Sequence, residues 1–214
     1  MMSEPHDRIL LVEGRDDAEV VKQFCNHHGI DNRRLFRIEV KNGIEALLDD
    51  LRVRPQTHVR VLGAIVDADT DPELRWRQLG DVMRRSGYEL PQRPSPSGTY
   101  LPAPNVFLPR IGLWMMPDNR VEGMLEDFLL RLTHDGDRLV TRAGKTVDDI
   151  PAEDRRFNPV HRSKATMYTW LAWQADPGTP LGQAITKRYL DPSRDPAPAF
   201  RDWLLALFTP APTP

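Results

Sequence analysis

The chain has 214 residues, of which 40% are hydrophobic and 28% are charged, and its formal net charge is -2. This composition excludes a disordered or fibrous protein, and the length suits one α/β domain with a small helical addition. The charge lacks the basic excess of a dedicated duplex-binding module. A nucleic-acid partner would therefore require local Arg and Lys clusters, a bound metal or a partner protein.

Features that would place the chain in or across a membrane are missing from the sequence. No apolar run approaches the roughly 20 residues that cross a bilayer, and the opening MMSEPHDRILLVEG lacks a signal-peptide apolar stretch. The single cysteine, Cys25, excludes an internal disulfide and a cysteine-based metal cluster. We expect a cytoplasmic protein with no membrane partner.

The first half alternates short apolar runs with amphipathic segments, which indicates βαβ units and a largely parallel sheet. Strands are expected at residues 8–12, 35–40 and 59–66. A helix is expected at residues 16–28, and a second between a cap at Asn42 and a stop at Pro55. A third begins at Asp71-Pro72, where Asp71 is interpreted as a helix cap, and ends at Gly87.

The composition changes after Gly87. Residues 91–104 (PQRPSPSGTYLPAP) indicate a surface loop, 106–116 one or two strands, 122–132 a helix and 133–160 a polar connection. Three short helices are expected at 163–174, 180–190 and 198–208, with apolar anchors at Trp170, Leu171, Trp203 and Leu204. We expect an α/β metal-binding domain over residues 1–135, a helical extension packed on it over 136–208, and a disordered tail over 209–214.

Acidic residues follow two of the expected strands. In LLVEGRDD a buried strand leads to Glu13, and in AIVDADTD another leads to Asp67 and Asp69. Side chains alternate along an extended segment, so Asp67 and Asp69 should point to the same side. If the strands are neighbours, Glu13 lies within one strand spacing, roughly 4.8 Å, of that pair. Half-buried carboxylates this close repel one another, and a hard cation such as Mg²⁺ removes the repulsion.

Two further residues adjoin Glu13. Gly14 would permit a sharp turn and leave room for a phosphate beside the metal. Asp17, one helical turn past Glu13, is placed to face the same cavity and hold a second ion. Acids at the start of a helix also complement its dipole without any other role. For Asp17 both interpretations stay open, and for Asp16 the dipole is preferred.

Glu13-Gly14-Arg15-Asp16-Asp17 after the first strand, with Asp67-Ala68-Asp69 after a later one, resembles the toprim domain. Bacterial primases, topoisomerases, small ribonuclease-like maturation proteins and overcoming-lysogenization-defect nucleases share that domain. The stretches GLWMMPDNRVEGMLEDFLL and HRSKATMYTWLAWQ look like a stand-alone toprim-related family of uncharacterised function allied to those nucleases. The resemblance implies a three-layer, mostly parallel sheet of about four strands, flanked by helices, with a helical C-terminal extension on one side.

Phosphoryl transfer assisted by Mg²⁺, with Mn²⁺ as a possible substitute, is the chemistry that the resemblance implies. It makes Glu13, Asp67 and Asp69 the primary metal ligands, with Glu13 also a catalytic acid or base and Asp17 a second acidic position. Lys164 matches a late catalytic lysine, although a surface lysine explains it nearly as well. Glu126 is the candidate for completing a second metal site, and a solvated helix face is the simpler alternative.

The expected function is a Mg²⁺-dependent nuclease, or a nuclease-like subunit, acting on nucleic acid, with DNA favoured over RNA. The sequence has no GxxxxGK[ST] loop, so coupling to ATP would require a separate ATPase as partner. One alternative is a catalytically silent toprim module that binds nucleic acid or protein within a larger complex. A receiver-like phosphoacceptor domain is another, although the Ser/Thr and Lys expected after its later strands are not evident.

Overall fold

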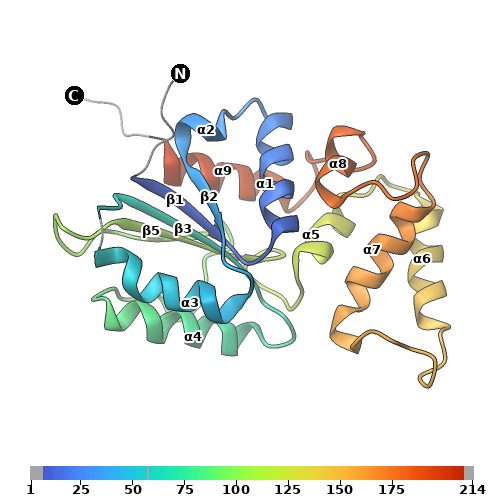
Figure 1. Cartoon of the computed structure of the whole chain (residues 1–214), viewed down its shortest axis with the longest axis horizontal. Coiled ribbons are helices and arrows are strands. Elements are labelled where there is room, and N and C mark those ends of the chain that lie inside the picture. The colour runs from blue at the N-terminus through green and yellow to red at the C-terminus, as the bar shows by residue number, and fades with distance from the viewer. Residues whose placement is uncertain (1–6, 57, 210–214) are drawn as a thin grey trace.

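The computed structural model describes residues 7–56 and 58–209 and is built around one five-stranded sheet (Figure 1). The strand order is β2-β1-β3-β5-β4; the first four are parallel to their neighbours, and β4 is antiparallel to β5. The strands are β1 (Arg8–Val12), β2 (Arg37–Val40), β3 (Val61–Asp67), β4 (Thr99–Leu101) and β5 (Arg110–Met116). The expected α/β class with a mostly parallel sheet is confirmed.

Helices cover both faces and one end of this sheet. In Figure 1, α3 and α4 lie on one face, α1 and α9 lie on the other, and α5 to α8 gather at one end. The α-helices are α1 (Arg15–His27), α2 (Asn32–Leu35), α3 (Ile44–Val53), α4 (Pro72–Arg85), α5 (Leu125–Arg131), α6 (Arg138–Asp148), α7 (Arg162–Ala172), α8 (Leu181–Thr186) and α9 (Ala197–Phe208). Two short 3-10 helices, η1 (Arg54–Gln56) and η2 (Pro159–His161), join them. None of the described helices is long and apolar enough to cross a membrane.

The alternation of β1 divides the interior into two cores. Leu10 and Val12 belong to the core that includes α1, α5 and α7 to α9, whereas Ile9 and Leu11 belong to the core under α3 and α4. This is the period of two expected of a strand covered on both faces. The expected helical segment after residue 136 contributes to the first core, because Trp170 and Trp203 are fully buried in it.

Most expected elements occur, with two differences. The strand at residues 8–12 has the expected bounds, and Asp71 caps α4 by accepting the Leu74 N–H at 2.8 Å. However, β4 lies inside the proline-rich segment interpreted as a loop. An edge strand of three residues depends on its partner, here β5, more than on its own sequence pattern. The expected disordered tail begins at Thr209, and its residues 210–214 lie outside the described residues.

The helix α6 occupies part of the expected polar connection. Its buried side includes Ala143, Gly144 and Val147, and the segment is strongly amphipathic, so the helical period was present in the sequence and was overlooked in a largely polar stretch. Asp137 starts the helix by accepting the Leu139 N–H at 2.8 Å. This buried side packs against α7, which stabilises the helix further.

The helix α9 packs directly on the central strands because two glycines make room for it. Gly63 of β3 and Gly112 of β5 are paired in register. A Cβ at Gly112 would lie 2.4 Å from Leu207 Cδ2, and one at Gly63 would lie 2.9 Å from Phe208 Cζ. Side chains at these positions would push α9 off the sheet.

A methyl group at the α9 contact should therefore destabilise the fold. We expect Gly112→Ala to lower the free energy of unfolding by roughly 1–3 kcal/mol, the usual effect of overpacking, measured by urea denaturation. Gly80→Ala is the matched control. It places a methyl group inside α4, where the nearest atom is the flexible end of Arg84 at 3.3 Å, and should be neutral or slightly stabilising. An equal effect of both changes would contradict the role given to Gly112.

Candidate metal centre

Glu13 and Asp67 meet at the carboxyl ends of two adjacent parallel strands. Glu13 follows β1, Asp67 ends β3, and the two strands are paired from Arg8↔Val61 to Val12↔Ile65. The Glu13 side chain accepts the backbone N–H of Asp67 through Oε1 at 2.8 Å. The expected proximity of these two residues is therefore seen, and the bond leaves the second oxygen of Glu13 for another contact.

Two helices add further acids to the same place. Asp17, in the first turn of α1, is 8% exposed, and Glu126, in the first turn of α5, is 2% exposed. A carboxylate this buried is uncommon unless it is paired. The solvated helix face proposed as the simpler explanation does not describe Glu126.

Gly14 is required for a reason different from the one expected. Its backbone is extended, with φ of -131°, a conformation open to any residue. A Cβ would instead lie 2.9 Å from Asp17 Oδ2, the oxygen that accepts the Gly14 N–H at 3.0 Å. The missing side chain thus makes room for the Asp17 carboxylate.

These carboxyl groups share one electrostatic environment. Burial raises the pKa of Asp67 well above its ordinary value, and neighbouring carboxylates raise it further: Asp17, Glu13, Glu126 and Asp69. Burial also raises the pKa of Glu13 to about 7, although the Asp67 N–H opposes the shift. It raises the pKa of Asp17 to about 6, against backbone hydrogen bonds to that carboxylate. Each group holds its proton more tightly because a charge here is both desolvated and repelled.

Lys164 of α7 supplies a positive charge to this group. Its Nζ lies 3.2 Å from Oε1 of Glu126, while 46% of its side chain remains exposed. Burial lowers its pKa, but the charges of Glu126, Asp16 and Asp67 outweigh burial and raise the pKa above its ordinary value. The sequence reasoning thus named a lysine that does reach the acids, and the packing of α7 against α5 brings it there.

Asp69 is placed differently from the expectation. The strand ends at Asp67, and Asp69 has a positive φ of 53°, so strand alternation does not relate the two side chains. The Asp69 carboxylate pairs with Arg75 of α4 and is 43% exposed. Arg75 also donates from Nε to the Asp67 carbonyl at 2.9 Å. Asp69 contributes negative charge at the edge of the group, already offset by an arginine that the sequence gave no reason to select.

Contacts with α7 surround the acids and were also missed. Asp127, next to Glu126, accepts the Met124 N–H at 2.9 Å and a hydrogen bond from the Ser163 hydroxyl. Asp16 accepts a hydrogen bond from the Tyr168 hydroxyl at 2.9 Å. These pairs join residues far apart in the chain, so no spacing in the sequence indicates them.

The family model described as "Protein of unknown function (DUF3226)" matches residues 7–209. The chain belongs to this family. No curated protein and no solved structure matches it. Because the match runs from β1 through α9, it spans both the sheet and the helices that carry Glu126 and Lys164.

The carboxyl groups fit a hard divalent cation by their chemistry. Mg²⁺ prefers carboxylate oxygens with retained water, and a cation would offset the repulsion that raises these pKa values. Glu13, Asp17 and Asp67 each use one oxygen to accept a backbone N–H, from Asp67, Gly14 and Leu125 respectively. Within residues 7–56 and 58–209, no three His, Cys, Asp or Glu side chains already form a group placed to hold a metal.

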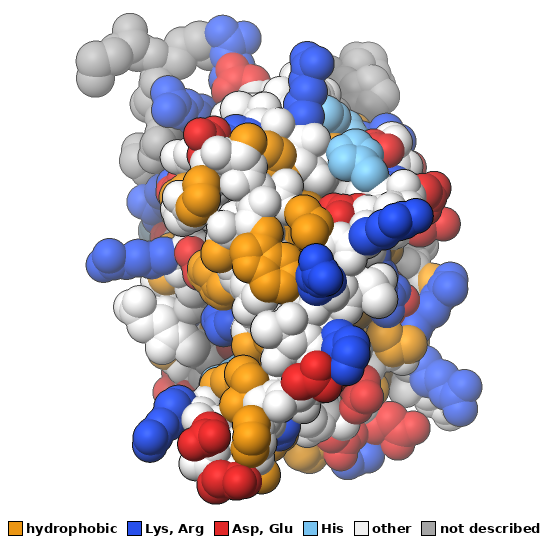
Figure 2. Space-filling view, turned by 90° about the vertical axis from the view of Figure 1, so that its right-hand side faces the viewer, with side chains coloured by type: hydrophobic (Ala, Val, Ile, Leu, Met, Phe, Trp, Pro, Cys, Tyr) orange, Lys and Arg blue, Asp and Glu red, His pale blue; other side chains and the backbone are white. Residues whose placement is uncertain are grey.

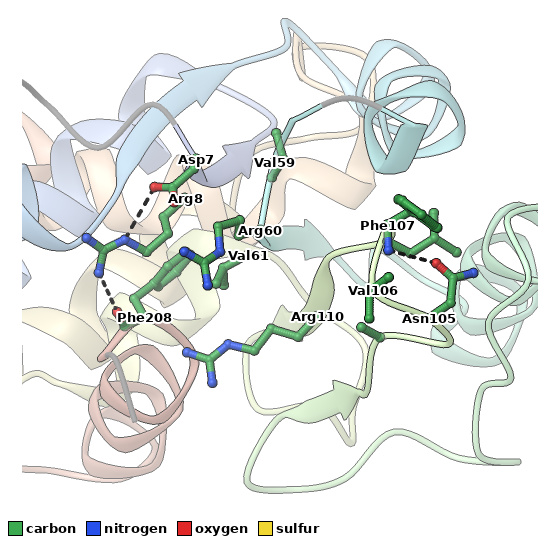
Figure 3. A pocket seen from close by; sticks show the side chains of 12 residues that line it. Asp7, Arg8, Val59, Arg60, Val61, Asn105, Val106, Phe107, Arg110 and Phe208 are labelled. Atoms are coloured by element: carbon green, nitrogen blue, oxygen red, sulfur yellow. Dashed lines mark hydrogen bonds and ion pairs between the residues drawn. The ribbon is translucent and has the colours of Figure 1, made fainter. Parts of the chain in front are cut away.

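A separate hollow of about 600 Å³ lies at the opposite ends of the strands (Figure 3). Its lining includes Arg8, Arg60 and Arg110, at or just before the starts of β1, β3 and β5, and none of the acids described above. Arg8 donates to the Phe208 carbonyl at 3.2 Å, and Arg110 donates to the Leu207 carbonyl. These two arginines cap the last turn of α9, so the hollow is explained by the fold and is not part of the acidic centre.

The raised carboxyl pKa values predict a specific pH dependence for the metal-free protein. A carboxyl group with a raised folded pKa favours folding below its unfolded pKa, and this advantage is lost as pH rises through the folded pKa. For Glu13 the window runs from about 4.5 to about 7. With a chelator present, Asp67→Asn should gain roughly 1–3 kcal/mol of stability relative to wild type between pH 5 and pH 8. Thermal unfolding at both pH values measures the difference.

Asn is the suitable replacement because its side-chain oxygen can still accept the Leu125 N–H that Asp67 Oδ1 accepts at 3.0 Å. Glu73→Asn is the control, since Glu73 is 85% exposed on α4. If the stabilities of wild type and Asp67→Asn change in parallel with pH, Asp67 does not have the raised pKa attributed to burial and to its neighbouring carboxylates.

Removing the positive charge of Lys164 should destabilise the protein, because the buried Glu126 carboxylate is paired with it. Lys164→Met leaves the Glu126 carboxylate buried without its cation, and we expect the metal-free protein to lose roughly 1–2 kcal/mol of stability. Lys145→Met is the control, because Lys145 pairs with the exposed Asp149 at 2.9 Å, and such a surface pair contributes little. Urea denaturation at pH 8 compares the two. Equal losses would mean that the Lys164 pair is an ordinary surface contact.

Proposed function

We propose that this protein is a divalent-metal-dependent nuclease of toprim type, or the nuclease-like subunit of a larger complex, acting on nucleic-acid phosphodiesters. The observation that carries the proposal is the group formed by Glu13, Asp17, Asp67 and Glu126, whose members raise the pKa of Asp67. The group lies past the carboxyl ends of parallel strands, where open α/β sheets place their ligand sites. The pattern of Glu13-Gly14 and Asp67-Ala68-Asp69 supports the toprim type.

Each residue has a defined part in this proposal. Glu13 and Asp67 hold the first Mg²⁺ or Mn²⁺, with Asp69 at the edge, and Asp17 and Glu126 hold a second. When bound, the metal supplies Lewis-acid stabilisation of the phosphate and a more acidic water. In keeping with the toprim resemblance, Glu13 would also act as the acid or base that moves a proton to or from the water.

Hydrolysis forms a bond from the water oxygen to phosphorus and breaks the bond from phosphorus to the sugar oxygen, which gains a proton. The ammonium of Lys164, 3.2 Å from Oε1 of Glu126, would be the residue that holds a phosphate oxygen. We favour DNA over RNA as the substrate. A separate ATPase or other protein is the partner that would supply further grip or coupling.

A catalytically silent binding module is the second candidate, favoured by one observation. The formal net charge of -2 gives the chain no basic excess with which to bind nucleic acid independently. A module that acts within a larger complex would obtain that affinity from its partners.

Cleavage assays distinguish these functions. Supercoiled plasmid, single-stranded DNA and RNA are incubated with the protein and Mg²⁺ or Mn²⁺. We expect cutting that a chelator abolishes, and a loss of at least about 100-fold in rate for both Glu13→Gln and Asp67→Asn. Both replacements keep an oxygen that accepts the backbone N–H, so the fold is retained.

The matched control for these acids is Glu73→Gln on the exposed face of α4, which should cleave at the wild-type rate. Cutting that persists in Asp67→Asn would contradict the metal assignment. Pure wild-type protein that cuts none of the three substrates, yet gains thermal stability from Mg²⁺, would favour the silent module.

A further inference from the structure

Beside the acidic group, α7 presents an aromatic side chain together with a cation. Lys164 and Tyr168 are four residues apart, so they lie on the same side of the helix. Tyr168 is 41% exposed, and 46% of the Lys164 side chain is exposed. Each is tied to an acid of the first turn of another helix, Lys164 to Glu126 and Tyr168 to Asp16.

The hydroxyl bond fixes the ring of Tyr168. Its Oη donates to Asp16 Oδ2 at 2.9 Å, and Asp16 precedes the buried Asp17 in α1. The charge of Glu126 also reaches this hydroxyl, since burial, Asp16 and Glu126 together raise the pKa of Tyr168 above its ordinary value. The aromatic ring therefore stands at the margin of the carboxyl group, with its polar end satisfied and part of its surface exposed.

The end of the molecule formed by α6, α7 and α8 carries side chains of several kinds. Figure 2 views this end, and hydrophobic, Lys or Arg, and Asp or Glu side chains are interspersed on it. Leu139 of α6 and Trp173 at the end of α7 are also exposed, at 36% and 38%. Arg15, next to Asp16 in the chain, is exposed as well. Exposed aromatic rings among cations are what single-stranded nucleic acid binds, through base stacking and phosphate contacts.

We propose that Tyr168 is a stacking platform for an unpaired base, and that the substrate of the acidic centre is single-stranded nucleic acid or an unpaired strand end. This inference rests on the proposed function, because the metal centre is what places a phosphate beside Lys164. Bases in a duplex are stacked on each other and offer no free face to the ring. The net charge of -2 also disfavours a duplex, whose binding depends on neutralising many phosphates.

Fluorescence anisotropy with a labelled single-stranded oligonucleotide of about 12 nucleotides, a typical site size, tests this proposal. A duplex of the same sequence is measured beside it, with Ca²⁺ in place of Mg²⁺ to slow hydrolysis. We expect Tyr168→Ala and Tyr168→Leu to weaken single-strand binding by about tenfold or more. Tyr168→Phe, which keeps the ring and loses the hydroxyl, should stay within about twofold of wild type. Duplex binding should change by less than about twofold in every variant.

Tyr100 of β4 offers a matched control for the ring. It is 43% exposed, and its hydroxyl donates to the Trp203 carbonyl at 3.4 Å, but it lies on the edge strand away from α7. Tyr100→Ala should bind the single strand as wild type does.

Three results would overturn the proposal: wild type that binds no single strand, Tyr168→Ala that binds as tightly as wild type, or Tyr168→Phe that loses as much as Tyr168→Ala. The last result would mean that Tyr168 acts only through its hydrogen bond to Asp16, which links α7 to α1. Cleavage measured in parallel separates this inference from the nuclease itself. If single strands bind through Tyr168 but are not cut, only the nuclease proposal is wrong. If Tyr168→Ala cuts single strands as fast as wild type, only the stacking proposal is wrong.

Discussion

Repulsion among buried carboxylates is the constraint to which the rest of this structure responds. Glu13, Asp17, Asp67 and Glu126 come from two strand ends and two helix starts. Backbone N–H groups accommodate three of them, and the cation of Lys164 accommodates the fourth. A domain with a folding free energy of only about 5–15 kcal/mol does not retain such a group without a compensating gain. That imbalance is the physical basis for inferring a bound cation.

The helical end of the molecule is part of the same arrangement. The first turn of α5 brings Glu126 inward, and α7 then brings Lys164 and Tyr168 to its margin. The sheet alone would leave Glu13 and Asp67 open on that side. The C-terminal helices are therefore part of the centre, because α7 supplies Lys164, the cation that pairs with Glu126.

Sequence reasoning reached the residues whose roles depend on local pattern. Glu13 and Asp67 directly follow apolar strands, so burial and adjacency could be predicted for both. Asp69 was predicted to accompany Asp67, and its charge does act on Asp67 and Glu13, but the strand ends before it and Arg75 pairs with its carboxylate. Lys164 was selected because it matches a late lysine of the toprim nucleases. Glu126 was selected as a candidate metal ligand, with a solvated helix face as the alternative. The contact between these two residues depends on tertiary packing, which local spacing does not encode. The strand β4 likewise depends on its partner β5, whereas the amphipathic pattern of α6 was present in the sequence and was overlooked.

The glycine groove under α9 has a consequence for how the protein is made. The face of the sheet that carries Gly63 and Gly112 is covered by α1 and α9, the first and last of the described helices. During synthesis, β1, α1 and β3 emerge early, and their apolar face then waits for a helix translated more than 100 residues after β3. A ribosome-bound chain that lacks α9 would expose Leu10 and Val12 to chaperones and to other nascent chains. This face of the sheet therefore cannot finish packing before α9 has been synthesised.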